Sequence, residues 1–166
     1  LDIPYLITST EQADAVFLGD IGTRFLDKLS GVQLYGLGIW ESGFRNLTNS
    51  KRDVNSVDDV AGLKIRTMEN SYHLAFWKAI GANPTPMSFS EVYIGLQQHT
   101  IDAQENPYEV IVSNRLYEQQ DYVVETNHLP HLISLIVNDD FFQNLTPEEQ
   151  EIMTQAAKTA TEYARE

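Results

Sequence analysis

Residues 63–81 read LKIRTMENSYHLAFWKAIG, and this stretch decides the fold. Residues 63–67 alternate apolar and polar side chains, which is typical of a β-strand with one buried face. Residues 69–80 then place apolar side chains three and four positions apart, which predicts an amphipathic helix that Gly81 is suited to end. A strand followed directly by a helix is the repeating step of an α/β fold, and Arg66 lies at the end of its strand.

Strands and helices continue to alternate on both sides of this stretch. Further strands are expected over 1–7, 32–40, 82–87, from 123 and over 132–137, and further helices over 9–31, 88–99, 108–118 and from 146. The remaining segments 41–55 and 101–107 are polar, and no strand is assigned to them. The order predicts an α/β protein with mixed, mainly parallel sheets flanked by helices, a fold that binds ligands at the carboxyl ends of its strands.

Composition and charge exclude several classes of function. The formal net charge of −13, from 24 acidic and 11 basic residues, opposes binding to nucleic acid and to anionic membrane surfaces. The chain has no cysteine, and no apolar run approaches the roughly 20 residues of a spanning helix, so direct membrane insertion is not expected. The four histidines lack metal-binding spacing and no glycine-rich nucleotide motif occurs, so neither a metal nor a cofactor is predicted.

Two arginines follow apolar strands and are candidates for binding an anionic ligand. Arg66 presents a planar guanidinium that matches the two oxygens of a carboxylate and stays charged at any working pH. Arg45 lies in the polar segment after residues 32–40 and offers a second cation. Spacing alone favours the more common interpretations, which are a salt bridge for Arg66 and a surface position for Arg45.

Four further residues have both a binding and an ordinary structural interpretation. Phe89 is placed either to cover a small ligand or to act as a hydrophobic staple at the start of a helix. Asn106 offers an amide to a ligand hydroxyl or caps the following helix. Glu69 and Asn70 stand at the next helix start, where they contact a ligand, pair with Arg66 or interact with the helix dipole.

Several of these segments together resemble the substrate-binding proteins of tripartite ATP-independent periplasmic (TRAP) transporters, across nearly the whole chain. The resemblance rests on WESGFR at 40–45, GLKIR at 62–66, GANPTPMSFSEVY at 81–93, LQQ at 96–98 and IDAQENP at 101–107. The sequence departs from the family pattern at Ser42, where Asn is frequent, and at Ala103, where Gly is usual. Some members also have Asn at the position of Glu69, which weakens any transfer of substrate identity.

The resemblance implies a role for each candidate residue. Arg66 corresponds to the arginine that binds the ligand carboxylate, and Arg45 to a second ligand arginine. Phe89 corresponds to the aromatic residue against the ligand and Asn106 to an amide that holds it, while Glu69 or Asn70 lies near another contact position.

The resemblance also implies an organisation into two lobes that close around a ligand. By that comparison residues 43–131 form the second lobe, whereas 1–42 and 132–166 are parts of the first, and the chain is a fragment that lacks about the first third of the protein. Sheet edges left open by missing strands are expected to favour a dimer.

The function that follows is non-enzymatic capture of a small organic acid, a sugar acid or C4-dicarboxylate, in the periplasm for delivery to the TRAP membrane subunits. One alternative is a ligand-sensing domain with the same fold. A second is an α/β enzyme in which Arg66 anchors a substrate carboxylate and His73, His99 or an acidic residue is the base.

Overall fold

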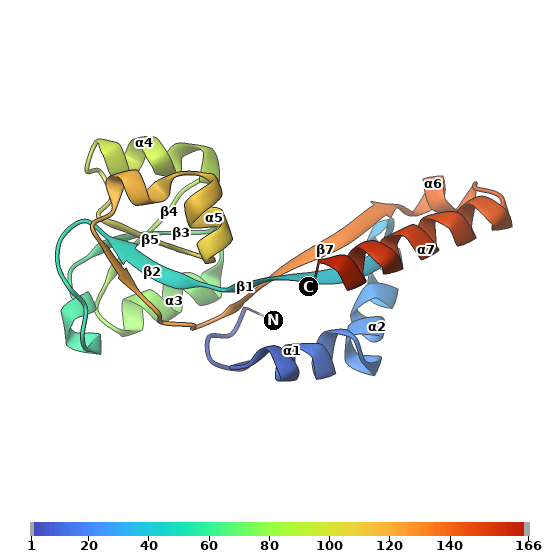
Figure 1. Cartoon of the computed structure of the whole chain (residues 1–166), viewed down its shortest axis with the longest axis horizontal. Coiled ribbons are helices and arrows are strands. Elements are labelled where there is room, and N and C mark those ends of the chain that lie inside the picture. Colours follow the sequence, from blue (N-terminus) through green and yellow to red (C-terminus); the bar gives the residue numbers. More distant parts are fainter. Residues whose placement is uncertain (1, 165–166) are drawn as a thin grey trace. The chain divides into compact units, whose positions relative to one another are not determined.

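The structure is a computed structural model that describes residues 2–164 (Figure 1). The chain forms two compact units, of which the first contains residues 2–8 and Gly43–His131 and the second contains Ser9–Ser42 and residues 132–164. Two paired strands, β1 (Leu34–Phe44) and β7 (Pro130–Asn138), each cross from one unit into the other.

The first unit is built on a sheet that has five strands in the described part of the chain, in the order β4-β3-β5-β2-β6. The strands are β2 (Asn46–Asn49), β3 (Lys64–Thr67), β4 (Asn83–Pro86), β5 (Ala103–Asn106) and β6 (Tyr122–Val124). β3 runs parallel to both β4 and β5, whereas β2 runs antiparallel to β5 and β6. The expected α/β fold with a mixed sheet is thus confirmed.

Helices cover both faces of this sheet, with α3 on one side and α4 and α5 on the other (Figure 1). They are α3 (Ser71–Ala79), α4 (Val92–Gln97) and α5 (Tyr108–Ser113), accompanied by short 3₁₀ turns η2 (Val57–Val60), η3 (Phe89–Glu91) and η4 (Leu116–Gln119). Trp77 of α3 packs with Leu47, Ile65 and Ala103 of the sheet. A second cluster joins α4, α5 and η4, so each face of the sheet has its own apolar core.

The second unit contains most of β1 and β7 with the remaining helices. These are α1 (Thr10–Phe17), α2 (Asp20–Asp27), the 3₁₀ helix η1 (Lys28–Val32), α6 (Asp139–Gln143) and α7 (Pro147–Tyr163). Thr146 and Glu149 form a reciprocal capping box that fixes the start of α7. The indole Nε1 of Trp40 donates to Thr161 Oγ1 at 2.7 Å and ties β1 to α7.

Several expectations about local structure were wrong. Residues 2–7 form turns and not a strand, because Tyr5 has a positive φ of 59° and its N–H bonds to the carbonyl of His128. The helix expected over 9–31 is divided, since α1 ends at Phe17 and α2 begins after an extended Gly19. The helix expected over 108–118 is divided too, because Arg115 has a positive φ of 52° between α5 and η4. The polar segments 41–55 and 101–107, to which no strand was assigned, contain the buried strands β2 and β5.

The contacts of Tyr5 also place residues 2–8 in the first unit, although the expected division grouped them with 9–42. The assignment of the two units to lobes of a larger protein stays a prediction. Across residues 2–164, no helix has both the length and the apolar content that a membrane crossing requires.

Replacing Ile65 by Ala tests whether the core under the sheet stabilises the first unit. Ile65 is fully buried, so the cavity left by Ile65→Ala should lower the free energy of unfolding by about 2–5 kcal/mol. Ile94 is the matched control because it is 49 % exposed, and Ile94→Ala should change the free energy of unfolding by less than about 0.5 kcal/mol. Equal effects of the two variants in urea unfolding would contradict the packing described.

Candidate functional site

The candidate site lies at the carboxyl ends of the parallel strands β3 and β5. Arg66 of β3 is the register partner of Gln104 of β5, and Asn106 follows two residues further along β5. Alternation of side chains along a strand therefore places these three residues on one face of the sheet. The opposite face at the same position carries Glu105, which is fully buried.

Arg66 is a buried cation whose hydrogen-bonding capacity is only partly used. Its Nε and Nη2 atoms donate to the carbonyl of Met87 at 2.9 and 2.7 Å, and its guanidinium carbon lies 5.7 Å from the ring centre of Phe89. Within residues 2–164 it forms no ion pair with a carboxylate. A guanidinium has five N–H donors, so Arg66 retains donors for an anion.

Burial and neighbouring charges act on Arg66 in opposite directions. Burial lowers the pKa of its guanidinium, the charge of Glu105 raises that pKa and the charge of Arg45 lowers it. Because the normal pKa of arginine is far above neutral, Arg66 remains charged. A cation that is partly removed from water and lacks a partner attracts an anion more strongly than a fully hydrated cation does, because the local dielectric is lower.

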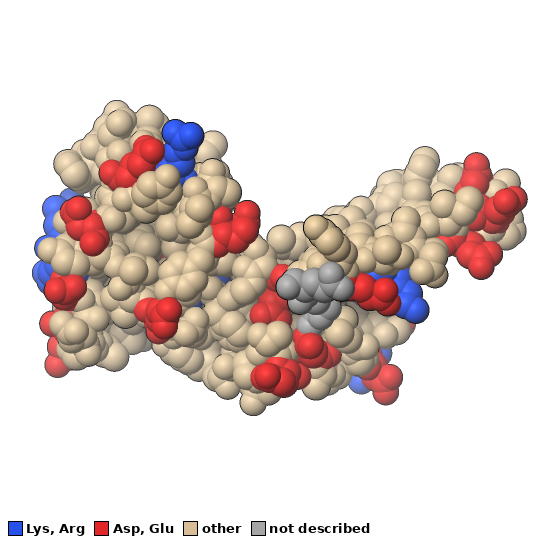
Figure 2. Space-filling view, in the orientation of Figure 1, with Lys and Arg blue, Asp and Glu red and all other residues tan. Residues whose placement is uncertain are grey.

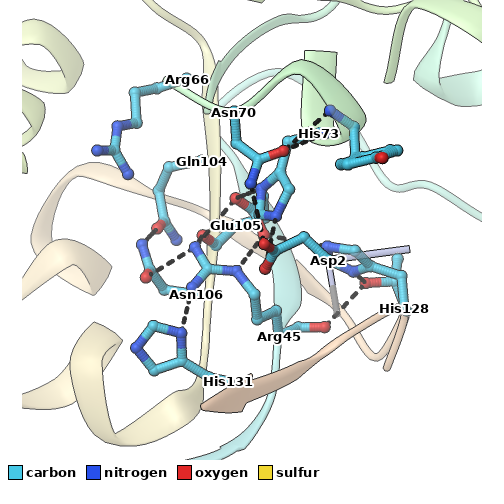
Figure 3. Close-up of polar contacts among 12 residues, drawn as sticks. Asp2, Arg45, Arg66, Asn70, His73, Gln104, Glu105, Asn106, His128 and His131 are labelled. Atoms are coloured by element: carbon cyan, nitrogen blue, oxygen red, sulfur yellow. Dashed lines mark hydrogen bonds and ion pairs between the residues drawn. The ribbon is translucent and has the colours of Figure 1, made fainter. Parts of the chain in front are cut away.

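Arg45 is in a different state because it is already paired. Its Nε donates to Glu105 Oε2 at 2.5 Å and its Nη2 to Glu105 Oε1 at 3.0 Å, in a bidentate ion pair with no exposed surface (Figure 3). Nη2 also donates to the carbonyl of Glu105 and to Asn106 Oδ1, and Nη1 bonds to His131 Nδ1. The expected surface position of Arg45 is wrong, and its charge is balanced within the protein.

Glu105 is held by several neighbours at once. His128 Nε2 lies 3.0 Å from Oε2, and His73 Nδ1 lies 3.7 Å from Oε1. Burial would raise the pKa of Glu105, but the charge of Arg45, the hydrogen bonds from Arg45 and His128 and the nearby ring of His73 outweigh it and hold the pKa well below its usual range. The carboxylate is therefore ionised and its two oxygens are occupied.

A line of amides continues from this ion pair across the other face of the sheet. Asn106 Nδ2 donates to Gln104 Oε1 at 2.6 Å, and Gln104 Nε2 donates to Thr48 Oγ1 at 2.7 Å. Thr48 in turn donates to Gln120 Oε1 at 2.8 Å. Asn106 does not cap the following helix, whose cap is Pro107, so its amide is oriented by Arg45 and Gln104 instead.

The structure separates the other candidates. Phe89 lies against Arg66 with 41 % of its surface exposed. Asn70 caps α3 by accepting from the N–H of Tyr72 at 2.9 Å, and it donates to Asp2 Oδ2 at 3.1 Å. Glu69 is exposed, and no described contact links it to this network.

Sequence reasoning missed Glu105, Gln104 and His128 as parts of the site. Glu105 and Gln104 stand beside Asn106 in the QENP motif, so their position was a usable signal, whereas His128 reaches the site only through the fold. Two cavities of the first unit, of about 210 and 190 Å³, are lined by neither Arg66 nor Asn106. No group of three potential metal ligands occurs among the residues described.

Comparison with known proteins identifies similar chains. The model of a family described as bacterial extracellular solute-binding protein, family 7, matches residues 1–166. The 2,3-diketo-L-gulonate-binding periplasmic protein YiaO of Escherichia coli K12 is 39% identical over 165 residues, which cover 99% of this chain and 50% of that protein.

Solved structures of similar periplasmic binding proteins also match nearly the whole chain. The sugar acid binding protein of Advenella mimigardefordensis in complex with galactonate is 38% identical, with a TM-score of 0.95 over 99% of this chain and 53% of that one. A TRAP periplasmic solute binding protein of Polaromonas sp. JS666 bound to D-erythronate is 40% identical, with a TM-score of 0.95 over 99% and 54%. The chain thus spans about half the length of the relatives it matches.

Removing the charge of Glu105 tests the central ion pair. Glu105→Gln leaves the buried charge of Arg45 without a counter-ion and should lower the free energy of unfolding by about 3–5 kcal/mol at pH 7. The exposed pair of Arg115 and Glu118 is the control, and Arg115→Gln should change the free energy of unfolding by less than about 1 kcal/mol.

The pH dependence of the same variant follows from the depressed pKa of Glu105. A carboxyl with a lower pKa in the folded state contributes stability above its unfolded pKa, about 4.3, and loses it as the pH falls through the lower folded value. The loss of stability caused by Glu105→Gln, measured by urea unfolding, should therefore be no smaller at pH 5.5 than at pH 7. A loss that has already decreased at pH 5.5 would contradict a stably ionised Glu105.

Proposed function

The chain belongs to the bacterial extracellular solute-binding proteins of family 7, as the resemblance predicted, and we propose that Arg66 captures the carboxylate of a small organic acid. The observation that carries the proposal is the difference between the two arginines. Arg45 is neutralised by Glu105, whereas Arg66 stands at the strand ends with free donors and an aromatic ring beside it. In this proposal the captured acid is delivered outside the cytoplasm to TRAP membrane subunits.

Each neighbouring residue has a part in this proposal. The exposed part of the Phe89 ring packs against the carbon chain of the acid, and the oriented amide of Asn106 bonds to an oxygen on it. Arg45 acts on the ligand through Asn106 and by balancing Glu105. Glu69 and Asn70 are proposed to lie further along the ligand, where Asn70 is already oriented by its cap.

Capture is proposed to involve closure of a facing surface over the acid. Water is excluded when such a surface closes, and the attraction between Arg66 and the carboxylate becomes stronger in the lower local dielectric. The overall charge of −13 does not prevent this, since repulsion between distant charges is screened over about 8 Å at physiological salt. Release to the transporter then requires the closed form to reopen.

The alternatives are less well supported. The matched family is one of binding proteins, which favours capture without turnover over an enzyme. Of the histidines considered as bases, His73 is buried near Glu105 and Asp2, and His99 is exposed in the turn after α4. A ligand-sensing role would use the same capture step. Dimerisation through open sheet edges stays a prediction.

Ligand-induced stabilisation of the 166-residue chain, and in parallel of the whole gene product that carries it, tests the proposal. Galactonate, erythronate, galacturonate, succinate and a neutral sugar are compared by thermal unfolding. At about a hundred times its dissociation constant a bound acid should add roughly 2.7 kcal/mol, which raises Tm by several degrees. Arg66→Ala should abolish the shift because the carboxylate loses its cation.

Lys64→Ala is the matched control, because it removes one positive charge from an exposed position of the same strand. It should leave the ligand-induced shift unchanged. If Arg66→Ala retained the shift of wild type, or if the neutral sugar and the acids gave equal shifts, carboxylate capture by Arg66 would be rejected.

A further inference from the structure

The contact between Arg45 and His131 fixes the proton position on a histidine next to the site. Arg45 Nη1 lies 2.7 Å from His131 Nδ1. A guanidinium nitrogen can only donate, so Nδ1 of His131 must accept with its lone pair. The imidazole is therefore neutral and carries its proton on Nε2, because an imidazolium would set two donors against each other.

The surroundings of His131 agree with a neutral ring. Burial and the charge of Arg45 lower its pKa, while the carboxylates of Glu105, Glu109 and Asp2 raise it by smaller amounts. The net direction is downward from a normal value of about 6.5, so the ring is neutral at physiological pH.

The Nε2 edge of the His131 ring points away from Arg45, and the ring lies on the side of Arg45 and Glu105 where Arg66 also lies (Figure 3). In Figure 3 the guanidinium of Arg66 and the His131 ring lie at opposite ends of that side, with Gln104 and Asn106 between them. Gln104 is the register partner of Arg66, and Asn106 is two residues, or roughly 7 Å, further along the strand. A ligand that contacts both Arg66 and His131 therefore needs a chain of several carbons.

The charges of the residues from Arg66 to His131 suit a ligand with one carboxylate and not a ligand with two. Within the described part of the chain Arg66 has no carboxylate partner, whereas Arg45 is balanced by Glu105 at 2.5 Å. The His131 end offers a neutral Nε2–H, which matches a hydroxyl or carbonyl oxygen. A second carboxylate at that end would lose its water and gain no cation.

We propose, on the basis of the proposed function, that His131 is a specificity-determining ligand contact. Its Nε2–H donates to a hydroxyl or carbonyl oxygen of a monocarboxylic acid whose carboxylate is bound by Arg66, and Nδ1 stays on Arg45. His131 thereby selects hydroxylated acids over unsubstituted acids of the same length and over dicarboxylates.

Two variants of His131 separate a ligand contact from a structural role. The side-chain oxygen of Asn can take the place of Nδ1 and accept from Arg45, but Asn has no group at the position of Nε2. Gln reaches the position of Nε2 with an N–H donor. His131→Asn should therefore keep the bond to Arg45 and lose the ligand contact, whereas His131→Gln should retain the ligand contact.

Calorimetric titration of the whole gene product with galactonate, hexanoate and adipate measures the selection, because all three acids have six carbons. Wild type should bind galactonate at least a hundredfold more tightly than hexanoate or adipate. His131→Asn should weaken galactonate binding by about tenfold and change hexanoate binding by less than twofold. His131→Gln should bind galactonate within about threefold of wild type.

Other results would overturn the proposal in distinguishable ways. Wild-type affinity for galactonate in His131→Asn, or an equal loss for galactonate and hexanoate, would give His131 only a structural role through Arg45. Nitrogen NMR that finds Nδ1 of His131 protonated at neutral pH would reject the assigned tautomer. Failure of the proposed function itself is recognised separately, because Arg66→Ala would then bind every acid as wild type does.

Discussion

The buried ion pair of Arg45 and Glu105 is the interaction on which the rest of the site depends. It joins the residue before β2 to a residue of β5, with both side chains inaccessible to water. Two buried charges are tolerated only when their remaining hydrogen-bonding groups are also satisfied. That requirement accounts for the surrounding histidines and for the bond from Arg45 to Asn106. The ion pair thus fixes the side chains around it in defined orientations and protonation states.

The two arginines show how environment and not residue type assigns a role. Arg45 has a carboxylate within hydrogen-bonding distance and contributes structure and orientation. Among the residues described, Arg66 donates to a backbone carbonyl and lies beside an aromatic ring but pairs with no carboxylate, and this leaves its charge available. In the proposed mode of binding, the ligand carboxylate meets the guanidinium of Arg66, and the oriented amide of Asn106 and the neutral ring of His131 contact the rest of the ligand. This combination is suited to an acid with one carboxylate and further oxygen atoms along its chain.

Much of the fold follows from local sequence pattern, whereas the buried polar strands and two changes of backbone direction do not. The alternation at 63–67 and the helical spacing after it predicted β3 and α3, and the helix expected from residue 146 is α7. β2 and β5 were missed because their buried side chains include Thr48, Gln104 and Glu105, which are buried only because partners from distant segments satisfy them. The interruption at Gly19 and the turn at Tyr5 likewise depend on backbone conformations that hydrophobic spacing does not reveal.

The candidate site was likewise predicted only in part from the sequence. The motif around Arg66, Phe89 and Asn106 indicated which residues gather at the strand ends, since each stands in a segment that resembles the family pattern. The pairing of Arg45 with Glu105 could not be predicted, because 60 residues separate them in the chain. The most direct test is a crystal structure of the whole gene product with bound galactonate. We expect the galactonate carboxylate about 2.8 Å from the guanidinium nitrogens of Arg66, with Arg45 still bound to Glu105. A carboxylate bound to Arg45 in place of Glu105 would contradict it.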